Sequence, residues 1–85
     1  MVKSLDVNDE RSVVRVDARE WRCPMPLLKL KQALRNAEAG QQIELLASDQ
    51  GSARDIPAWL SGTPHQLQSV QEADGIWCFC VRVSA

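Results

Sequence analysis

The sequence lacks any apolar run that approaches the roughly 20 residues needed to cross a bilayer. Residues 1–12 are polar and charged and contain no apolar stretch, so we expect no secretory signal. Charge of one sign is not in excess, because ten lysines and arginines stand against eleven aspartates and glutamates. A chain that binds nucleic acid by itself is normally strongly basic. We therefore expect a cytoplasmic protein with no membrane anchor and no stable nucleic-acid binding.

Cysteine and histidine are scarce, with three and one residues respectively. Cys78 and Cys80 are two apart on a predicted strand, too far to bridge without distortion, so we expect no disulfide framework. No Cys-x-x-Cys pair is present, which excludes a thioredoxin-type dithiol. Cys23 has no near partner at metal-ligand spacing, and nothing requires His65 to approach it as a Cys–His hydrolase would. We expect neither a metal nor another cofactor.

The composition is that of an ordinary globular protein, with 45% apolar and 25% charged residues. We expect residues 1–11 to form a flexible N-terminal arm and residues 12–85 to form a single domain. We also expect a monomer that meets its partners transiently.

The hydrophobic periodicity predicts the element order β-α-β-α-β-β. Gly40 is expected just after the first helix, Ser52 at the N-cap of the second, and residues 73–75 in a hairpin turn. Right-handed crossovers place both helices on one face of a four-stranded mixed sheet, which gives a two-layer α/β sandwich. The predicted strands span 13–17, 43–47, 66–71 and 76–83, and the predicted helices span 24–39 and 52–61.

The most informative segment is the one that opens the first helix. Cys23 precedes the helical pattern, and prolines at positions 24 and 26 are tolerated there because the first amides of a helix have no partner within it. For this reason we place Pro24 at N1 and Pro26 at about N3. The two rings also stiffen the first turn. The amides of Met25 and Leu27 are then predicted to be free to face an anion.

This position has a chemical consequence for the thiol. A helix N-terminus carries about half a positive charge, and cysteines there have pKa values lowered from about 8.5. Arg19 and Arg22 could add to the effect. We therefore predict that Cys23 is a reactive thiolate at neutral pH. A lone activated thiol can accept a group, hold it and pass it on, and a persulfide fits this chemistry well.

Over residues 13–83 the sequence resembles the TusA/SirA-like sulfur-carrier family. The resemblance rests on the C-P-M-P motif at 23–26 followed by L-L-K-L-K-Q-A-L, on Asp17-Ala18, on Gly40 and on the R-D-I-P segment at 54–57. It implies a fold like the C-terminal domain of translation initiation factor three. It also implies a persulfide carried on Cys23, a donor that is a cysteine desulfurase or rhodanese-type protein, and an acceptor in tRNA 2-thiolation, molybdenum-cofactor maturation or sulfur oxidation.

The sequence departs from the family at Glu20, where members usually have glycine. If that glycine permits a tight turn, Glu20 changes the loop, and its negative charge opposes thiolate formation. Two alternatives therefore stay open. One is a regulatory or protein-binding module that transfers no sulfur, and the other is a thiol redox sensor that links Cys23 to Cys78 or Cys80.

Several further residues are candidates for partner docking or for setting charge at the site. Trp21 could dock or pack, and Lys29 could be a solvated helix residue or meet an acidic partner. Arg54 and Asp55 could serve the start of the second helix or contribute to the site. The full set is Arg19, Trp21, Arg22, Lys29, Arg54 and Asp55.

Overall fold

The computed structural model describes residues 13–84, so the predicted arm at 1–11 lies outside the described residues. Its element order is the predicted β-α-β-α-β-β. No helix within residues 13–84 has the length and apolar character needed to span a membrane. The elements are β1 (Val13–Asp17), α2 (Met25–Asn36), β2 (Gln42–Ala47), α3 (Gln50–Leu60), β3 (Gln66–Ala73) and β4 (Ile76–Arg82).

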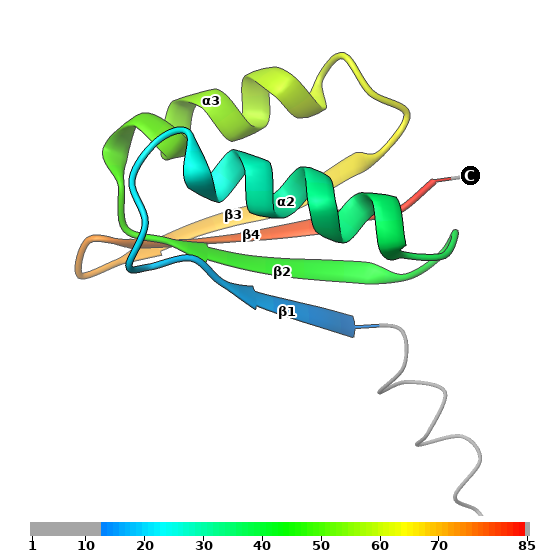
Figure 1. The fold of residues 1–85 in the computed structure, drawn as a ribbon, viewed down its shortest axis with the longest axis horizontal. Coiled ribbons are helices and arrows are strands. Elements are labelled where there is room, and N and C mark those ends of the chain that lie inside the picture. The colour runs from blue at the N-terminus through cyan, green and yellow to red at the C-terminus, as the bar shows by residue number, and fades with distance from the viewer. Residues whose placement is uncertain (1–12, 85) are drawn as a thin grey trace, which may run out of the picture.

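The four strands form one mixed sheet in the order β1-β2-β4-β3. β1 and β2 are parallel, whereas β4 is antiparallel to both β2 and β3. Both helices cover the same face of this sheet, as predicted (Figure 1). Because β1 and β2 run in the same direction, the loops that follow them leave the sheet at the same edge. The amide of Ala18 donates to the carbonyl of Leu46 at 2.8 Å and joins these two loops at their start.

The core lies between the sheet and the two helices. Ile43, Leu45 and Ala47 of β2 are fully buried and alternate with more exposed residues, as one face of a strand requires. Phe79 and Val81 continue this face on β4, and the partly buried Trp77 packs against it. Each fully buried large apolar side chain contributes about 1.5–3 kcal/mol. The helices contribute Leu30, Leu34, Ile56 and Leu60 to this core.

The ends of the helices differ from the prediction. α2 ends at Asn36, not at residue 39, so Gly40 is not the residue after the helix. Gly40 does have a positive φ of 92°, but it lies in the turn before β2, where its amide donates to Val83. The N-cap of α3 is Asp49, three residues before the predicted Ser52. The hairpin is confirmed, because Asp74 and Gly75 have φ values of 54° and 80°, as a type I′ turn requires.

Candidate functional site

Cys23 lies at the start of α2, directly before the N-cap residue Pro24, and its side chain is exposed. The Cys23–Pro24 peptide bond is cis. The amide of Met25 donates to the carbonyl of Arg22 at 2.7 Å. The prediction that this amide is free to bind an anion was therefore wrong, because the turn before the helix uses it. Pro24 is the N-cap rather than N1, and Pro26 lies one position earlier in the helix than predicted.

The start of α3 holds the backbone of this loop through Asp49. Oδ2 of Asp49 accepts the amide of Ser52 at 3.0 Å, which caps α3, and the same oxygen accepts the amide of Cys23 at 3.1 Å. The hydroxyl of Ser52 also donates to it at 3.3 Å. One carboxylate oxygen thus joins the starts of the two helices. Asp49 was not among the predicted site residues.

Gly51 allows the two helix starts to approach each other this closely. A Cβ atom at this position would lie 3.1 Å from Oδ2 of Asp49 and 3.5 Å from Cβ of Cys23. The first separation is shorter than ordinary van der Waals contact, so a larger residue here requires the Asp49 carboxylate, which holds the Cys23 amide, to shift by a few tenths of an ångström.

The thiol itself faces a carboxylate. Sγ of Cys23 donates to Oδ2 of Asp55 at 3.2 Å. This hydrogen bond is the largest cause that raises the pKa of Cys23 above its ordinary value, followed by partial desolvation and the negative charges of Asp55 and Asp49. The charge of Arg54 lowers the pKa, but less. The predicted lowering of the thiol pKa is therefore contradicted, because the Asp55 carboxylate accepts the thiol and the charge of Asp49 adds to its effect.

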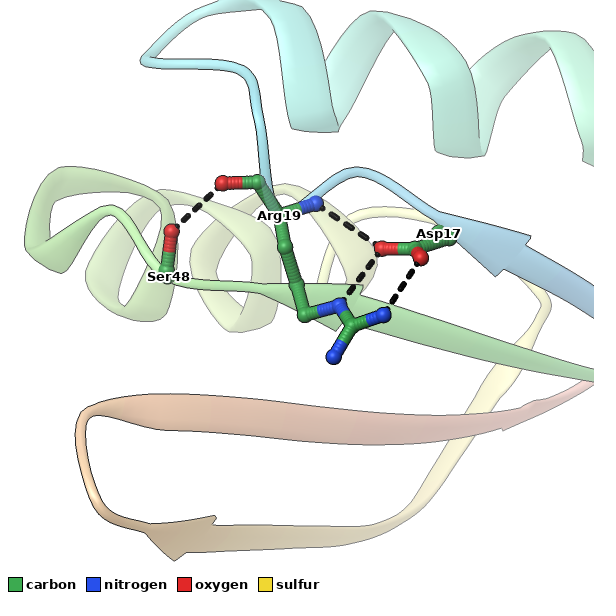
Figure 2. Close-up of polar contacts among 3 residues, drawn as sticks. All are labelled: Asp17, Arg19 and Ser48. Atoms are coloured by element: carbon green, nitrogen blue, oxygen red, sulfur yellow. Dashed lines mark hydrogen bonds and ion pairs between the residues drawn. The ribbon is translucent and has the colours of Figure 1, made fainter.

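Arg19 does not support the thiolate. Its guanidinium is engaged with Asp17 through bonds of 2.8 and 2.7 Å, and the carbonyl of Arg19 accepts the hydroxyl of Ser48 (Figure 2). The hydrogen bonds from the Arg19 side chain, and then the one from its backbone amide, lower the pKa of Asp17 to about 2. Arg19 therefore fastens the end of β1 to the loop after β2. Arg22 is exposed on the Cys23 loop and is not among the charges that shift the thiol pKa.

The backbone at Glu20 removes one of the objections to the family resemblance. Among residues 13–84, Asp74 is the only non-glycine residue with a positive φ, so Glu20 has an ordinary conformation. Its charge is also not among those that shift the pKa of Cys23. The negative charge beside the thiol comes instead from Asp49, the N-cap of α3, and from Asp55 within α3.

An exposed surface that combines apolar and basic groups adjoins Cys23. Trp21 and Leu28 are 41% and 47% exposed, and Nζ of Lys29 lies 5.0 Å from the centroid of the Trp21 ring. A shallow groove along α2 continues this surface. It is lined by Met25, Leu28, Lys29, Gln32 and Arg35.

The remaining thiols and the histidine lie elsewhere. Cys78 and Cys80 alternate on β4 with the core residue Phe79, so their side chains lie on the sheet face opposite the helices. Burial is the main cause that raises the pKa of Cys78. His65 lies in the loop before β3, where Nδ1 accepts the amide of Ser84. Residues 13–84 contain no group of three or more side chains that could hold a metal ion.

Comparison with known proteins identifies the family. The model of the family described as Sulfurtransferase TusA matches residues 14–83. The chain is 39% identical to a protein of Archaeoglobus fulgidus, named a candidate sulfur carrier, over 82% of this chain and 96% of that one. It is 34% identical to the sulfur carrier protein TusA of Pseudomonas putida, over 82% and 88%. A crystal structure of a SirA-like protein from Desulfitobacterium hafniense has the same fold, with a TM-score of 0.72 over 85% of this chain and 99% of that one at 24% identity. The chain therefore belongs to the TusA family of sulfur carriers.

Proposed function

We propose that Cys23 is the sulfur-carrying residue and holds a sulfane sulfur as a persulfide. The observation that carries this proposal is the exposure of the Cys23 thiol in a loop whose backbone Asp49 fixes. An exposed thiol at a defined position can meet the active sites of two different proteins in turn. Pro24 and Pro26 restrict the backbone at the start of α2, and Leu27 belongs to the same first turn.

The transfer is a thiol–disulfide type of exchange. The Cys23 thiolate attacks the outer sulfur of a donor persulfide, the donor S–S bond breaks, and the donor cysteine leaves as a thiolate. The proton from Cys23 goes to solvent or to the departing donor thiolate. In delivery, Cys23 is the leaving group instead of the nucleophile. An acceptor thiolate attacks the outer sulfur, the S–S bond to Cys23 breaks, and Cys23 leaves as a thiolate. The sulfane sulfur carries its oxidation state with it, so no external oxidant is needed.

The partners are a protein sulfur donor, either a cysteine desulfurase or a rhodanese-type protein, and a protein acceptor. The acceptor serves tRNA 2-thiolation, molybdenum-cofactor maturation or related sulfur trafficking. Trp21 and Arg22 precede Cys23 on its loop, and Lys29 lies over the Trp21 ring, so these three residues form the surface we propose for docking. The carrier works in the cytoplasm as a monomer, without a cofactor.

The test is to incubate the protein with a cysteine desulfurase and cysteine, and to map added sulfur by peptide mass spectrometry. We expect an added sulfur on Cys23 and none in Cys23→Ala. A Cys78→Ser, Cys80→Ser double variant serves as the matched control and loads like the unaltered protein. Label on Cys78 or Cys80 alone contradicts the proposal, and so does full biological activity of Cys23→Ser, which would favour a regulatory module.

A further inference from the structure

We propose that Asp55 is a positioning residue that keeps the proton on Cys23 in the free carrier, and that a sulfur-transfer partner releases the thiolate by placing a basic side chain against Asp55. This inference rests on the proposed role of Cys23. It adds a control on when that thiol reacts, and it states one chemical feature of the partner surface.

The geometry singles out Asp55 among the charged groups around the sulfur. Asp49 faces the same loop, but its Oδ2 is engaged by Cys23, by the Ser52 amide and by the Ser52 hydroxyl. Asp55 instead uses its Oδ2 to accept the thiol itself at 3.2 Å. The other charge that acts on the sulfur is that of Arg54 on α3. Arg22 on the loop is not among the charges that shift the thiol pKa, and Arg19 is held by Asp17.

The positive charge available within the carrier is too loosely held to cancel Asp55. Nε of Arg54 lies 3.7 Å from Oδ1 of Asp55, and the Arg54 side chain is 83% exposed. Such a surface ion pair is weak and is screened by solvent. Asp55 itself is 40% exposed at its side chain, so a basic residue of a docked protein can reach it. In the contact with that protein, water is excluded, so the pair formed by Asp55 and the partner's basic residue is stronger than the exposed pair of Asp55 and Arg54.

The carboxylate slows exchange in both directions in the free carrier. Uptake needs the Cys23 thiolate as nucleophile, and discharge needs Cys23 to leave as a thiolate. A neighbouring negative charge disfavours that anion in each case. When a partner's basic group pairs with Asp55, the Cys23 proton leaves to solvent and the thiolate attacks the donor's outer sulfur. The donor S–S bond breaks and the departing donor thiolate takes up a proton, so protons and sulfur balance.

The first test measures the reactivity of Cys23 without any sulfur. The rate of Cys23 alkylation by iodoacetamide is followed against pH by peptide mass spectrometry, which separates Cys23 from Cys78 and Cys80. We expect the inflection to move to lower pH in Asp55→Asn, with about tenfold faster alkylation at neutral pH for each unit of the shift. Asp55→Glu keeps the charge and is expected to stay near the unaltered protein, while Arg54→Gln moves the inflection upward.

Glu38→Gln is the matched control, because it removes one negative charge from the exposed residue beyond the far end of α2. We expect its profile to match that of the unaltered protein. Circular dichroism and urea unfolding establish that each variant is folded. A folded Asp55→Asn protein with an unchanged inflection, or one shifted no more than Glu38→Gln, overturns the role of Asp55.

The second test concerns the partner. Loading of Cys23 at neutral pH is compared for glutathione persulfide and for a cysteine desulfurase supplied with cysteine. We expect Asp55→Asn to accelerate loading from the small persulfide more than loading from the protein, since the protein already neutralises Asp55. If Asp55→Asn accelerates loading equally from both sources, the proposal that the partner places a basic group against Asp55 is wrong. If Cys23 loads from neither source, the proposed function and the proposed basic group of the partner are both wrong. The alkylation profile still tests whether Asp55 keeps the proton on Cys23, because it needs no sulfur.

Discussion

The carboxylate oxygen of Asp49 that caps α3 also holds the backbone amide of Cys23, 26 residues earlier in the chain. The start of the second helix therefore fixes the loop that presents the thiol. Ser48 reinforces this attachment by donating to the carbonyl of Arg19. The position of the reactive sulfur thus depends on two loops that meet because β1 and β2 are parallel neighbours.

Replacement of Asp49 by alanine should destabilise the protein. The substitution removes the acceptor for Ser52 and for the Cys23 amide, and loss of an N-cap costs about 0.5–2 kcal/mol. Urea unfolding measures the change. Asp49→Asn is the matched control, since asparagine also caps helices, and it should lose less stability. Equal losses in the two variants would show that the carboxylate charge, not the cap, carries the effect.

A bulky residue at position 51 should separate the Cys23 loop from α3. In Gly51→Leu the added Cβ would meet Oδ2 of Asp49 at 3.1 Å, so this carboxylate, which accepts the Cys23 amide, must shift, whereas the 3.5 Å contact with Cβ of Cys23 is an ordinary one. We expect the Cys23 amide to lose protection, which hydrogen exchange followed by NMR detects. Gly62→Ala is the control, because its nearest contact is 3.7 Å, from the carbonyl of Trp59, and its exchange pattern near Cys23 should be unchanged. A fully protected Cys23 amide in Gly51→Leu would contradict the prediction.

The fold could be predicted from the sequence because its signals are local. The alternation of Trp77, Phe79 and Val81 and the helical spacing of Leu30 and Leu34 each state which face meets the core. Right-handed crossovers then leave few arrangements of four strands and two helices. The predicted element order is confirmed for this reason, and the errors lie at the helix ends.

The electrostatics of the site could not be predicted in the same way. The approach of Asp55 to Cys23 joins residues 32 apart and depends on how α3 crosses α2. A thiol at a helix start predicts a lowered pKa only while no carboxylate faces it, and no local pattern reports that. One signal for Asp49 was available in the sequence. Aspartate is a preferred N-cap residue, and Asp49 lies three residues before Ser52, so it could have been chosen as the helix start instead of Ser52.

Two leucines of α2 offer a matched test of the core. Leu30 is fully buried, whereas Leu28 is 47% exposed on the same helix. Leu30→Ala should cost about 2–5 kcal/mol, because it removes buried methyl groups and leaves a cavity. Leu28→Ala should change the free energy of unfolding by about 0.5 kcal/mol or less. Chemical denaturation measures both values, and similar losses in the two variants would contradict the placement of α2 on the sheet.

The Asp17–Arg19 pair should contribute to stability in a defined pH range. The pKa of Asp17 is about 2 in the folded protein against an ordinary 3.8. A carboxylate with a lowered folded-state pKa stabilises the protein above its unfolded pKa, and this contribution is lost as pH falls from about 4 to about 2. The difference in urea midpoint between the unaltered protein and Arg19→Gln should therefore shrink over that range. Arg35→Gln, on the exposed side of α2, should show no such convergence, and a constant difference for Arg19→Gln would contradict the assignment.

The last prediction concerns docking beside the thiol. Trp21 is 41% exposed, and its ring lies next to the amine of Lys29, so it offers an apolar and cationic contact within two residues of Cys23. Truncation of an aromatic anchor in an interface costs at least about 1–2 kcal/mol, so Trp21→Ala should raise the KM for a cysteine desulfurase about tenfold. Its iodoacetamide profile at Cys23 should not change, because Trp21 is not among the groups that shift the thiol pKa. Val70→Ala, which truncates an equally exposed residue on β3, is the control. An unchanged KM in Trp21→Ala would contradict this prediction and would mean that the desulfurase docks on a surface without Trp21.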